Sequence, residues 1–264
     1  MPEGPEAKIA SDYFNNFFKS SSNIKFELLT DYYQNKYGSV FNTLNKNIKN
    51  YSESFTVGKN IFIEINEDLI FNFHLGMTGG WSTENIIHCH FKVTNENKEL
   101  FFKDVRKFGK MKILTKKEFE IKFNSQIDIL NRDYNKNIHL EFLNEKVKTK
   151  RSVCAIIMDQ KFFPGVGNYI KSEVLYACKI HPEKKWNLLS IKKINNLLDE
   201  LNKIMTHSYL SGGAELKDFK NPFNESDFKL KIYGKKETPL KKKVTSIITS
   251  DNRKTWFCKA TQKL

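Results

Sequence analysis

The first residues of the chain carry groups that could perform covalent chemistry. Pro2 follows the start methionine, and that methionine is usually removed before a small residue, which would leave Pro2 with a free secondary amine. Carboxylates stand close by at Glu3 and Glu6. An amine beside a carboxylate supplies the parts for attack on a carbonyl-like carbon with proton transfer. Many chains begin with methionine and proline, so these residues alone do not establish catalysis. The rest of the sequence has to indicate a binding partner and a fold.

The charge of the chain indicates which partner to expect. The 264 residues carry a formal net charge of +14 and have a pI of about 9.4. A chain this basic usually meets phosphates, with nucleic acid as the first expectation and an anionic membrane surface as the second. A solvated, lysine-rich surface is the plain alternative. With 39% hydrophobic residues and 22 Phe, the composition excludes a disordered chain.

The cysteines and the apolar runs indicate the compartment. The four cysteines are Cys89, Cys154, Cys178 and Cys258. No two lie within ten residues of each other, which excludes a C-x-x-C motif and does not resemble a secreted disulfide framework. The sequence shows neither a signal pattern nor an apolar run of 18 residues. We therefore expect a soluble, intracellular protein that is not secreted and has no membrane segment. A monomer is the separate expectation for its oligomeric state.

The first half of the chain predicts one helix and then a series of strands. Pro5 suits the first helical position, and an apolar face follows at Ile9, Tyr13, Phe14 and Phe17. From about residue 24 to 125 the pattern changes to short strand-like runs divided by Gly, Asn and Asp. The clearest runs are residues 60–65, 69–73, 90–93 and 100–102. Their spacing predicts an antiparallel sandwich or barrel.

The second half is mainly helical and ends in a hairpin. Residues 126–140 are polar and Asn-rich, and are predicted to connect two domains. Helices are expected at about 152–160, at 169–179, and from the cap Ser190 to about His207. The amides at Gly167 and Asn168 could hold a backbone phosphate at a helix start, with a plain helical hairpin as the alternative. The strand-like runs 243–248 and 253–258 enclose a turn at Asp251 and Asn252.

Three loops among the strands carry residues suited to DNA. Lys59 follows a glycine, and Met77 lies in the Gly-rich stretch 74–80. Arg106 and Phe108 share a tight turn at 104–109. Cations neutralise phosphates, and exposed apolar side chains can stack on a base or wedge between bases. Taken singly, such residues are usually surface charges and core packing.

Taken together and in order, these motifs resemble one family. The set comprises residues 1–6 (MPEGPE), Gly58-Lys59, His74-Leu75-Gly76-Met77, Asp104-x-Arg106-Lys107-Phe108-Gly109, Gly165-Val166-Gly167-Asn168 with Glu173, Tyr233-Gly234-Lys235, and Arg253-x-Thr255-x-x-Cys258. The chain resembles the formamidopyrimidine-DNA glycosylase / endonuclease VIII (Fpg/Nei) family of base-excision repair enzymes. Any one motif is weak, whereas the ordered set spans almost the whole chain.

The resemblance implies an α+β fold of two domains. It implies an N-terminal catalytic domain (1–125) with a helix and an antiparallel β-sandwich, and a linker (126–140). It further implies a helical helix–two-turn–helix domain (141–228) that binds DNA, and a β-hairpin finger (229–264). The implied partner is damaged DNA, as duplex and, as an alternative, as single strand.

The resemblance also assigns roles to residues. Pro2 resembles the Schiff-base nucleophile, Glu3 the proton donor, and Lys59 the proton donor associated with β-elimination. Arg253 resembles the finger arginine tied to phosphate binding and δ-elimination, and Glu6 and Glu173 are supporting residues. Four positions match DNA contacts: His88, Arg106, Lys150 and Asn168. Three match residues that fill the space of a flipped nucleotide: Met77, Arg106 and Phe108. This implies a bifunctional DNA glycosylase/AP lyase, with β- or β,δ-elimination open.

The sequence departs from the family pattern in three places. The four positions of the finger's zinc ligands fall on Leu240, Lys243, Cys258 and Thr261. One thiol cannot hold a structural zinc, so the sequence resembles Nei-like proteins with a zincless finger, and no cofactor is expected. Cys154 replaces a lysine of the formamidopyrimidine branch, and the segment between 216–219 and Tyr233 is short. These departures favour oxidised pyrimidines and ring-opened or further-oxidised purines over 8-oxoguanine.

Two other readings are open on the sequence. A DNA-binding protein that has kept the fold and lost catalysis is the main rival, although Pro2, Glu3, Lys59 and Arg253 are all present. A basic binder of nucleic acid or membrane surfaces explains the charge but leaves the ordered motifs unexplained.

Overall fold

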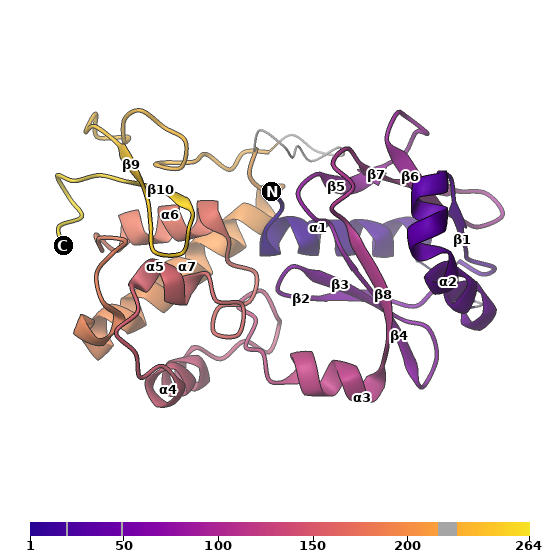
Figure 1. The fold of residues 1–264 in the computed structure, drawn as a ribbon, viewed down its shortest axis with the longest axis horizontal. Coiled ribbons are helices and arrows are strands. Elements are labelled where there is room, and N and C mark those ends of the chain that lie inside the picture. Colours follow the sequence, from indigo (N-terminus) through magenta and orange to yellow (C-terminus); the bar gives the residue numbers. More distant parts are fainter. Residues whose placement is uncertain (20, 49, 216–225) are drawn as a thin grey trace. The chain divides into compact units, whose positions relative to one another are not determined.

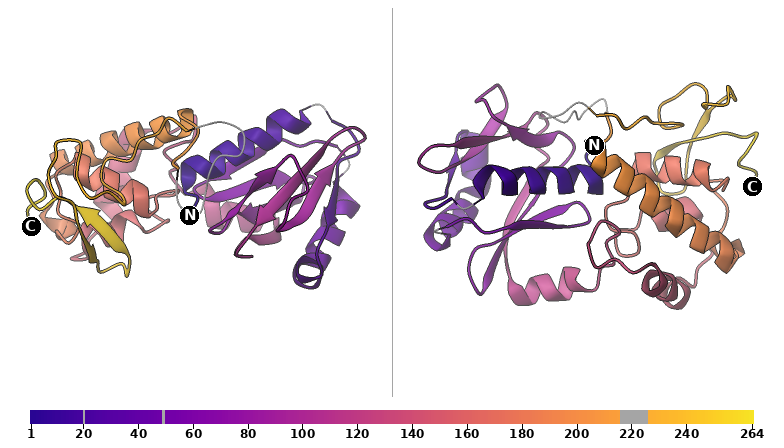
Figure 2. Two further views of the ribbon diagram at one scale, coloured as in Figure 1. Left: turned by 90° about the horizontal axis from the view of Figure 1, so that it is seen from above. Right: turned by 180° about the vertical axis from the view of Figure 1, so that it is seen from behind.

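The chain folds into two compact units. In this computed structural model, residues 1–264 are described except 20, 49 and 216–225. The first unit consists mainly of Glu6–Ser125, and the second mainly of Gln126–Ala214 and Asp227–Leu264. Residues Glu3–Pro5 group with the second unit, while Met1–Pro2 group with the first. Figures 1 and 2 show the strand-rich first unit and the mainly helical second unit.

The first unit contains two four-stranded antiparallel sheets. One sheet has the order β1 (Lys25–Leu28), β6 (Cys89–Thr94), β7 (Glu99–Asp104) and β5 (Gly79–Ser82). The other has the order β2 (Ser54–Val57), β3 (Asn60–Glu64), β4 (Leu69–His74) and β8 (Lys110–Thr115). Both sheets send alternate side chains into one aromatic core, as expected for a sandwich. The predicted sandwich is therefore confirmed.

Helix α1 (Gly4–Phe18) supplies part of that core. Phe14 and Phe18 are almost fully buried, and the indole N–H of Trp81 on β5 donates to the Ala10 carbonyl at 2.9 Å. Phe14 stacks on Trp81 with ring centroids 6.0 Å apart. The predicted apolar face is present, but Phe18 rather than Phe17 lies deepest.

The strand-like pattern expected over residues 24–125 is interrupted by helix α2 (Asp31–Asn47). Its buried residues Tyr33, Tyr37, Phe41 and Leu44 follow helical spacing. The many Asn and Tyr residues lower the apparent hydrophobicity of this segment, so the prediction of strands alone was wrong there. After β8 the chain forms α3 (Lys116–Phe119) and a π-helical turn, η1 (Glu120–Asn124).

The second unit begins inside the segment predicted as a linker. Helix α4 (Lys136–Lys146) starts there with the Asn135 side chain as its cap. It is followed by α5 (Val153–Ile157), α6 (Asn168–Ala177), the 3₁₀ turn η2 (Trp186–Leu188), α7 (Ile191–Leu210), and the hairpin β9 (Thr245–Ile248) and β10 (Lys254–Phe257). The Ser190 hydroxyl caps α7 as predicted. No helix of the described residues is long and apolar enough to span a bilayer.

His139 ties α4 to the loop after α5. Its Nε2 lies 2.8 Å from the Phe162 carbonyl oxygen, the hydroxyl of Tyr134 lies 3.3 Å from its Nδ1, and the side chain is fully buried. Burial lowers the pKa of His139 from 6.5 to about 4. Between these two values the unfolded chain binds the proton and the folded chain does not, so stability is lost as the pH falls through this window.

We predict that the free energy of unfolding falls by roughly 3 kcal/mol because of His139 between pH 6.5 and 4. In His139→Gln, an amide can still donate to Phe162 but cannot titrate, so this share of the pH dependence should disappear. Urea unfolding of both proteins at several pH values measures the difference. The prediction is contradicted if the free energy of unfolding changes with pH to the same extent in both proteins.

Candidate active-site residues

The carboxylate of Glu3 lies at the N-terminus of helix α6. It accepts backbone N–H bonds from Gly167 at 2.7 Å, Tyr169 at 2.9 Å and Ile170 at 3.3 Å. Unpaired N–H groups and the helix dipole make this end of a helix a site for an anion. A backbone phosphate was the sequence-based expectation for the amides of Gly167 and Asn168, and Glu3 of the protein itself takes the Gly167 amide.

Gly167 is required by the close approach of Glu3. A Cβ atom on Gly167 would lie 2.2 Å from the Glu3 carboxyl carbon, so any side chain there would displace the Glu3 carboxylate from its position. The neighbouring backbone is held as well, because the Gly4 amide donates to the Gly165 carbonyl at 2.8 Å. Glu3 and Gly4 therefore bind directly to the glycine-rich motif that precedes α6.

The other candidates near the N-terminus lie in the first unit. Pro2 is buried and Glu6 is fully buried. Lys59 sits in the turn between β2 and β3, directly after Gly58, whose φ is +61°. Lys59 acts on His74: burial first, and then the charges of Lys59 and Lys110, lower the pKa of His74 to about 4. His74 is thus neutral near pH 7 in the folded protein.

The loops that carry Met77, Arg106 and Phe108 are joined by the buried carboxylate of Asp104. One oxygen accepts the Thr78 hydroxyl at 2.6 Å. The other accepts the Gly109 amide at 2.7 Å and the Tyr33 hydroxyl at 3.1 Å. Burial, followed by the Asp104 charge, raises the pKa of Tyr33. The Thr78 hydroxyl oxygen in turn accepts the Arg106 amide at 2.9 Å, so the two loops share one hydrogen-bonded centre.

These loops also touch directly and present the predicted side chains together. Gly76 has φ +66°, and a Cβ there would lie 2.5 Å from the Phe108 carbonyl carbon. The guanidinium of Arg106 covers the Phe108 ring at 4.8 Å, and 48% of Phe108 is exposed. Met77 and Phe108 line one hollow of about 750 Å³, together with His74 and lysines on α2 and β8. The structure thus brings the three predicted space-filling residues together.

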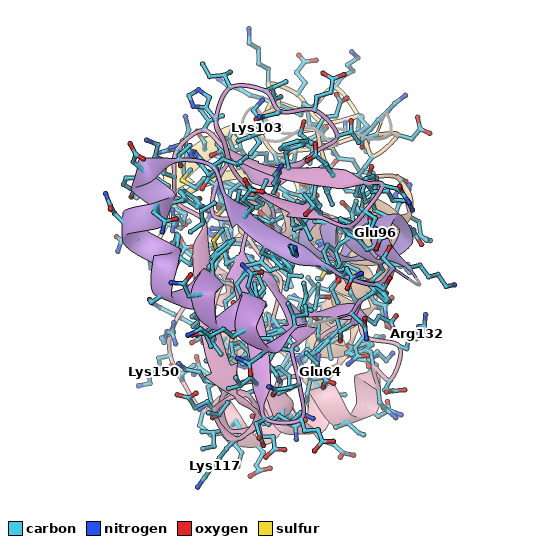
Figure 3. All side chains as sticks on the ribbon, turned by 90° about the vertical axis from the view of Figure 1, so that its right-hand side faces the viewer. Glu64, Glu96, Lys103, Lys117, Arg132 and Lys150 are labelled. Carbon is cyan, nitrogen blue, oxygen red and sulfur yellow. The ribbon has the colours of Figure 1, made fainter. Side chains whose placement is uncertain are left out.

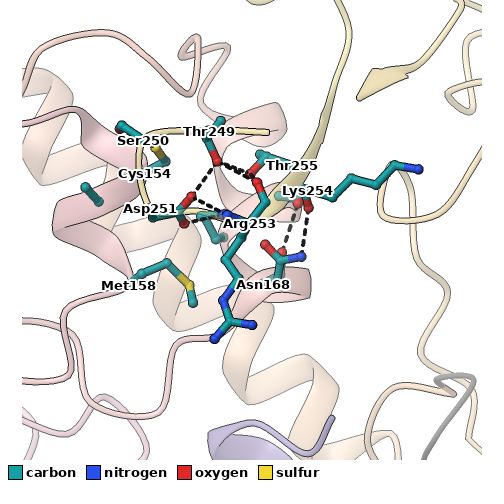
Figure 4. Close-up of polar contacts among 12 residues, drawn as sticks. Cys154, Met158, Asn168, Thr249, Ser250, Asp251, Arg253, Lys254 and Thr255 are labelled. Atoms are coloured by element: carbon teal, nitrogen blue, oxygen red, sulfur yellow. Dashed lines mark hydrogen bonds and ion pairs between the residues drawn. The ribbon is translucent and has the colours of Figure 1, made fainter. Parts of the chain in front are cut away.

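Arg253 lies at the end of the turn between β9 and β10. Its side chain is exposed and extends away from the hydrogen-bonded turn (Figure 4). The turn is closed by the Thr249 amide, which donates to the Arg253 carbonyl at 3.0 Å, and by Asn252 with φ +58°. The predicted hairpin and its turn are present.

The four positions matching zinc ligands do not fit a metal ion. Leu240 is 70% exposed, and Cys258 is fully buried against Ile232 and Val244. Hydrogen-bonded turns stand at both places: the Thr238 amide donates to the Lys242 carbonyl, and the Gln262 amide to the Cys258 carbonyl. Among the described residues, no group of three His, Cys, Asp or Glu is arranged to hold a metal.

Glu173 supports the base of the finger. Its buried carboxylate accepts the amides of Lys231, Ile232 and Tyr233, at 2.9 to 3.1 Å. Burial raises the pKa of Glu173, and these three backbone donors oppose the rise. Glu173, which was predicted as a supporting residue, therefore binds the backbone of residues 231–233.

The predicted DNA contacts come from both units, with His88 and Arg106 in the first and Lys150 and Asn168 in the second. His88 is half-buried with φ +73°, at the bulged start of β6. Lys150 is exposed and points outward from the ribbon (Figure 3). Asn168 donates from its amide to the Lys254 carbonyl at 2.9 Å. The segment 216–219, used in the argument on substrates, lies outside the described residues.

Four residues that build these sites were given no such role from the sequence: Thr78, Asp104, Lys171 and Asp251. Asp104 was named only as the first residue of a motif, and Asp251 only as a turn residue. Thr78 directly follows Met77, and a hydroxyl and a carboxylate beside two Gly-containing turns were a usable signal. Lys171 lies in α6, where residues 169–175 are all buried, and no local pattern indicated a buried cation there.

Comparison with protein families matches both units of this chain. The formamidopyrimidine-DNA glycosylase N-terminal domain matches residues 1–111, and the formamidopyrimidine-DNA glycosylase H2TH domain matches residues 129–220. A formamidopyrimidine-DNA glycosylase of Rickettsia conorii is 30% identical over 277 residues, covering 99% of each chain. One from the Wolbachia of Brugia malayi is 26% identical over 99% of this chain and 100% of its own.

Solved structures show the same fold. A Lactococcus lactis Fpg in complex with DNA containing an abasic site has a TM-score of 0.84 at 23% identity, covering 99% of this chain and 100% of that one. A mutant of the same Fpg, solved with Fapy-dG containing DNA, also has a TM-score of 0.84 at 22% identity, with full coverage of both chains.

The fold and the two domain matches define a DNA glycosylase of base excision repair. The chain belongs to the formamidopyrimidine-DNA glycosylase family. The family predicted from the ordered motifs is thus confirmed, and so is the two-domain α+β fold. The narrower assignment to a Nei-like branch with a zincless finger stays a prediction.

We predict that Thr78→Val lowers the free energy of unfolding by about 1–3 kcal/mol, because Asp104 loses a donor and the Arg106 amide loses an acceptor. Thr78→Ser keeps the hydroxyl and should stay within about 0.5 kcal/mol of the natural protein. Urea unfolding of the three proteins measures these differences. Equal losses in the Val and Ser variants would show that the hydroxyl does not join the loops.

Proposed function

We propose that this chain is a bifunctional DNA glycosylase/AP lyase that removes oxidised bases through a Schiff base on Pro2. The observation that carries the proposal is the Pro2-Glu3 pair on a chain of this family, with the Glu3 carboxylate held at the N-terminus of α6. The Lactococcus lactis proteins of the same fold were solved with abasic-site DNA and with Fapy-dG DNA, which supports damaged DNA as the substrate.

The chemistry needs Pro2 as a free amine, after removal of Met1. The nitrogen lone pair attacks C1′ of the deoxyribose, the bond from C1′ to the base breaks, and the base leaves with that electron pair and a proton. When the sugar ring opens, its oxygen gains a proton and a cationic iminium joins Pro2 to C1′. A secondary amine leaves no N–H on the iminium, so the charge persists and acidifies the C2′ proton. Loss of that proton expels the 3′ phosphate, which is β-elimination.

Glu3 supplies the proton transfer in this scheme. An α-amine titrates near ~8, so part of it is protonated at pH 7 and must lose its proton before it attacks. A carboxylate one residue along can accept that proton and return it to the ring oxygen or the base. Its three backbone N–H bonds fix the carboxylate in one orientation for both transfers.

The loops of the first unit suit a flipped nucleotide. Flipping a base costs a few kcal/mol of lost stacking. Phe108 is exposed and Met77 is half-buried, both on loops that Asp104 holds in place, so these apolar side chains can replace part of that stacking. Arg106 can hydrogen-bond the orphaned partner base. Lys59 is proposed to assist β-elimination. Besides Arg106, four positions are proposed to contact DNA or phosphate: His88, Lys150, Asn168 and Arg253.

The proposed substrates are oxidised pyrimidines and ring-opened or further-oxidised purines. Cys154, at the position of a lysine in the formamidopyrimidine branch, is fully buried and lies 3.1 Å from the Ser152 hydroxyl. A buried thiol cannot provide the cation that a lysine would. This difference supports a shift away from 8-oxoguanine within the family.

We predict that the protein lacking Met1 forms a covalent adduct with damaged DNA when borohydride reduces the Schiff base. Pro2→Gly and an uncleaved Met1 should each lower trapping sharply, because the first changes the secondary amine and the second blocks it. Electrophoresis of end-labelled DNA measures the adduct. A catalytically inactive DNA-binding protein would bind the same DNA and give no adduct with the natural sequence.

We predict that a metal chelator leaves the trapping rate and the thermal midpoint unchanged. Hydrogen-bonded turns and the packing of Cys258 on Ile232 and Val244 hold the finger, and a zinc ion would need further thiolates. Cys258→Val, which keeps an apolar side chain, should retain trapping. Stoichiometric zinc in the purified protein, or activity lost to a chelator and restored by zinc, would refute the metal-free finger.

A further inference from the structure

A buried ion pair joins helix α6 to the turn of the finger hairpin. The Lys171 ammonium lies 2.6 Å from Oδ2 of Asp251, and the two side chains are 0% and 7% exposed. The seven other ion pairs found among the described residues each have at least one side chain that is a quarter or more exposed. Two charges are costly to bury unless each is well paired and hydrogen-bonded. The burial of this ion pair therefore indicates that it has a specific structural role.

The second oxygen of Asp251 holds the turn itself. Oδ1 accepts the Thr249 hydroxyl at 2.5 Å and the Arg253 amide at 3.2 Å. The Thr249 hydroxyl also lies 2.9 Å from the Arg253 carbonyl oxygen and 2.7 Å from the Thr255 hydroxyl. Asp251 thus binds Lys171 with one oxygen and the backbone of Arg253 with the other. Figure 4 shows the contacts of Asp251 with Thr249 and Arg253 as dashed lines.

Two more contacts attach the same turn. Asn168, one helical turn before Lys171 on α6, donates to the Lys254 carbonyl at 2.9 Å. The Ser250 amide donates to the Glu183 carboxylate at 2.7 Å. The residues on both sides of Arg253 are therefore fixed to the helical unit, whereas the Arg253 side chain itself is exposed.

We propose that Lys171 is a positioning residue for Arg253. Through Asp251 it fixes the finger turn on α6, so that the Arg253 guanidinium is presented to a DNA phosphate in one orientation. The role of Arg253 rests on the proposed function, while the anchoring of the turn does not. Lys171 is fully buried and cannot contact DNA directly, so its effect on DNA must pass through the turn.

The hairpin needs such an anchor. β9 and β10 pair over only four residues each, and an isolated two-stranded hairpin is marginally stable in water. Leu240, Lys243, Cys258 and Thr261 supply no set of ligands that could hold a metal ion beside the hairpin. A buried ion pair also sets one register, since any shift of the turn would leave both charges unpaired. The arginine is then ordered before DNA arrives, which reduces the entropy lost on binding.

The test compares Lys171→Met with Lys203→Met. Lys203 lies on α7 and pairs with Glu200 at 2.8 Å but is 70% exposed, so it controls for the loss of one positive charge. Hydrogen exchange of the Thr249, Asn252 and Arg253 amides should accelerate roughly tenfold or more in Lys171→Met alone. Unchanged exchange in α6 shows that the unit is still folded. Equal exchange of the turn amides in Lys171→Met and the natural protein overturns the proposal.

Kinetics then separate positioning from plain stability. For trapping on abasic-site DNA, Lys171→Met should raise KM roughly 10- to 100-fold, as for a lost hydrogen bond to a charged group. The rate at saturating DNA should stay within about twofold, because Pro2 and Glu3 are untouched. Lys171→Arg keeps the cation, so its KM should lie between that of Lys171→Met and that of the natural protein. A fall in the saturating rate with unchanged KM would contradict the positioning role.

A double-mutant cycle links the effect to Arg253. Arg253→Ala and Lys171→Met should raise KM by similar factors, and the double variant no further, because both remove the same contact. Additive losses would overturn the proposal. If Lys171→Met affects folding, Asp251→Asn, which keeps an acceptor for Thr249 or Lys171, should show a smaller effect in the same direction.

The two hypotheses fail in different ways. If Arg253→Ala leaves DNA affinity unchanged, the proposed role of Arg253 fails, while faster exchange of the turn in Lys171→Met still supports the anchor. If trapping is absent from the natural protein but the exchange result holds, the lyase assignment alone is lost.

Discussion

The second unit depends on helix α6, and above all on the anion site at its N-terminus. Glu3 fills that site through three backbone N–H bonds, and Gly167 leaves room for it. The same helix carries Asn168 and Lys171, which hold the finger turn. Two residues after Lys171, Glu173 holds the segment that leads into the finger. A single helix of ten residues thus fixes the N-terminal carboxylate and the hairpin of Arg253.

In the first unit, one buried carboxylate holds two loops together. Two short loops bring Met77, Arg106 and Phe108 together. Asp104 accepts hydrogen bonds from both, and Thr78 extends this centre to the Arg106 backbone. Since each buried bond would be costly to leave unmade, the loops are fixed as a pair rather than independently.

The finger hairpin is held mainly by its contacts with neighbouring segments, because its own strands are short. Hydrogen-bonded turns, an apolar cluster around Cys258, and the ion pair to α6 supply these contacts. A finger held in this way should be sensitive to mutations at its contacts with the helices.

The sequence by itself determined the family, the two-domain fold and most of the candidate residues. Those signals are local: ordered short motifs, strand alternation, helix caps, and the loss of three thiol positions. It did not predict α2, whose apolar spacing is hidden among Asn and Tyr residues, or α4 inside the expected linker. It also did not indicate that Glu3 takes the Gly167 amide at the start of α6. Only the tertiary structure decided that contact and the pairing of Lys171 with Asp251, because residues 80 or more positions apart meet through the packing of the helices and the hairpin, and no local pattern encodes such a meeting.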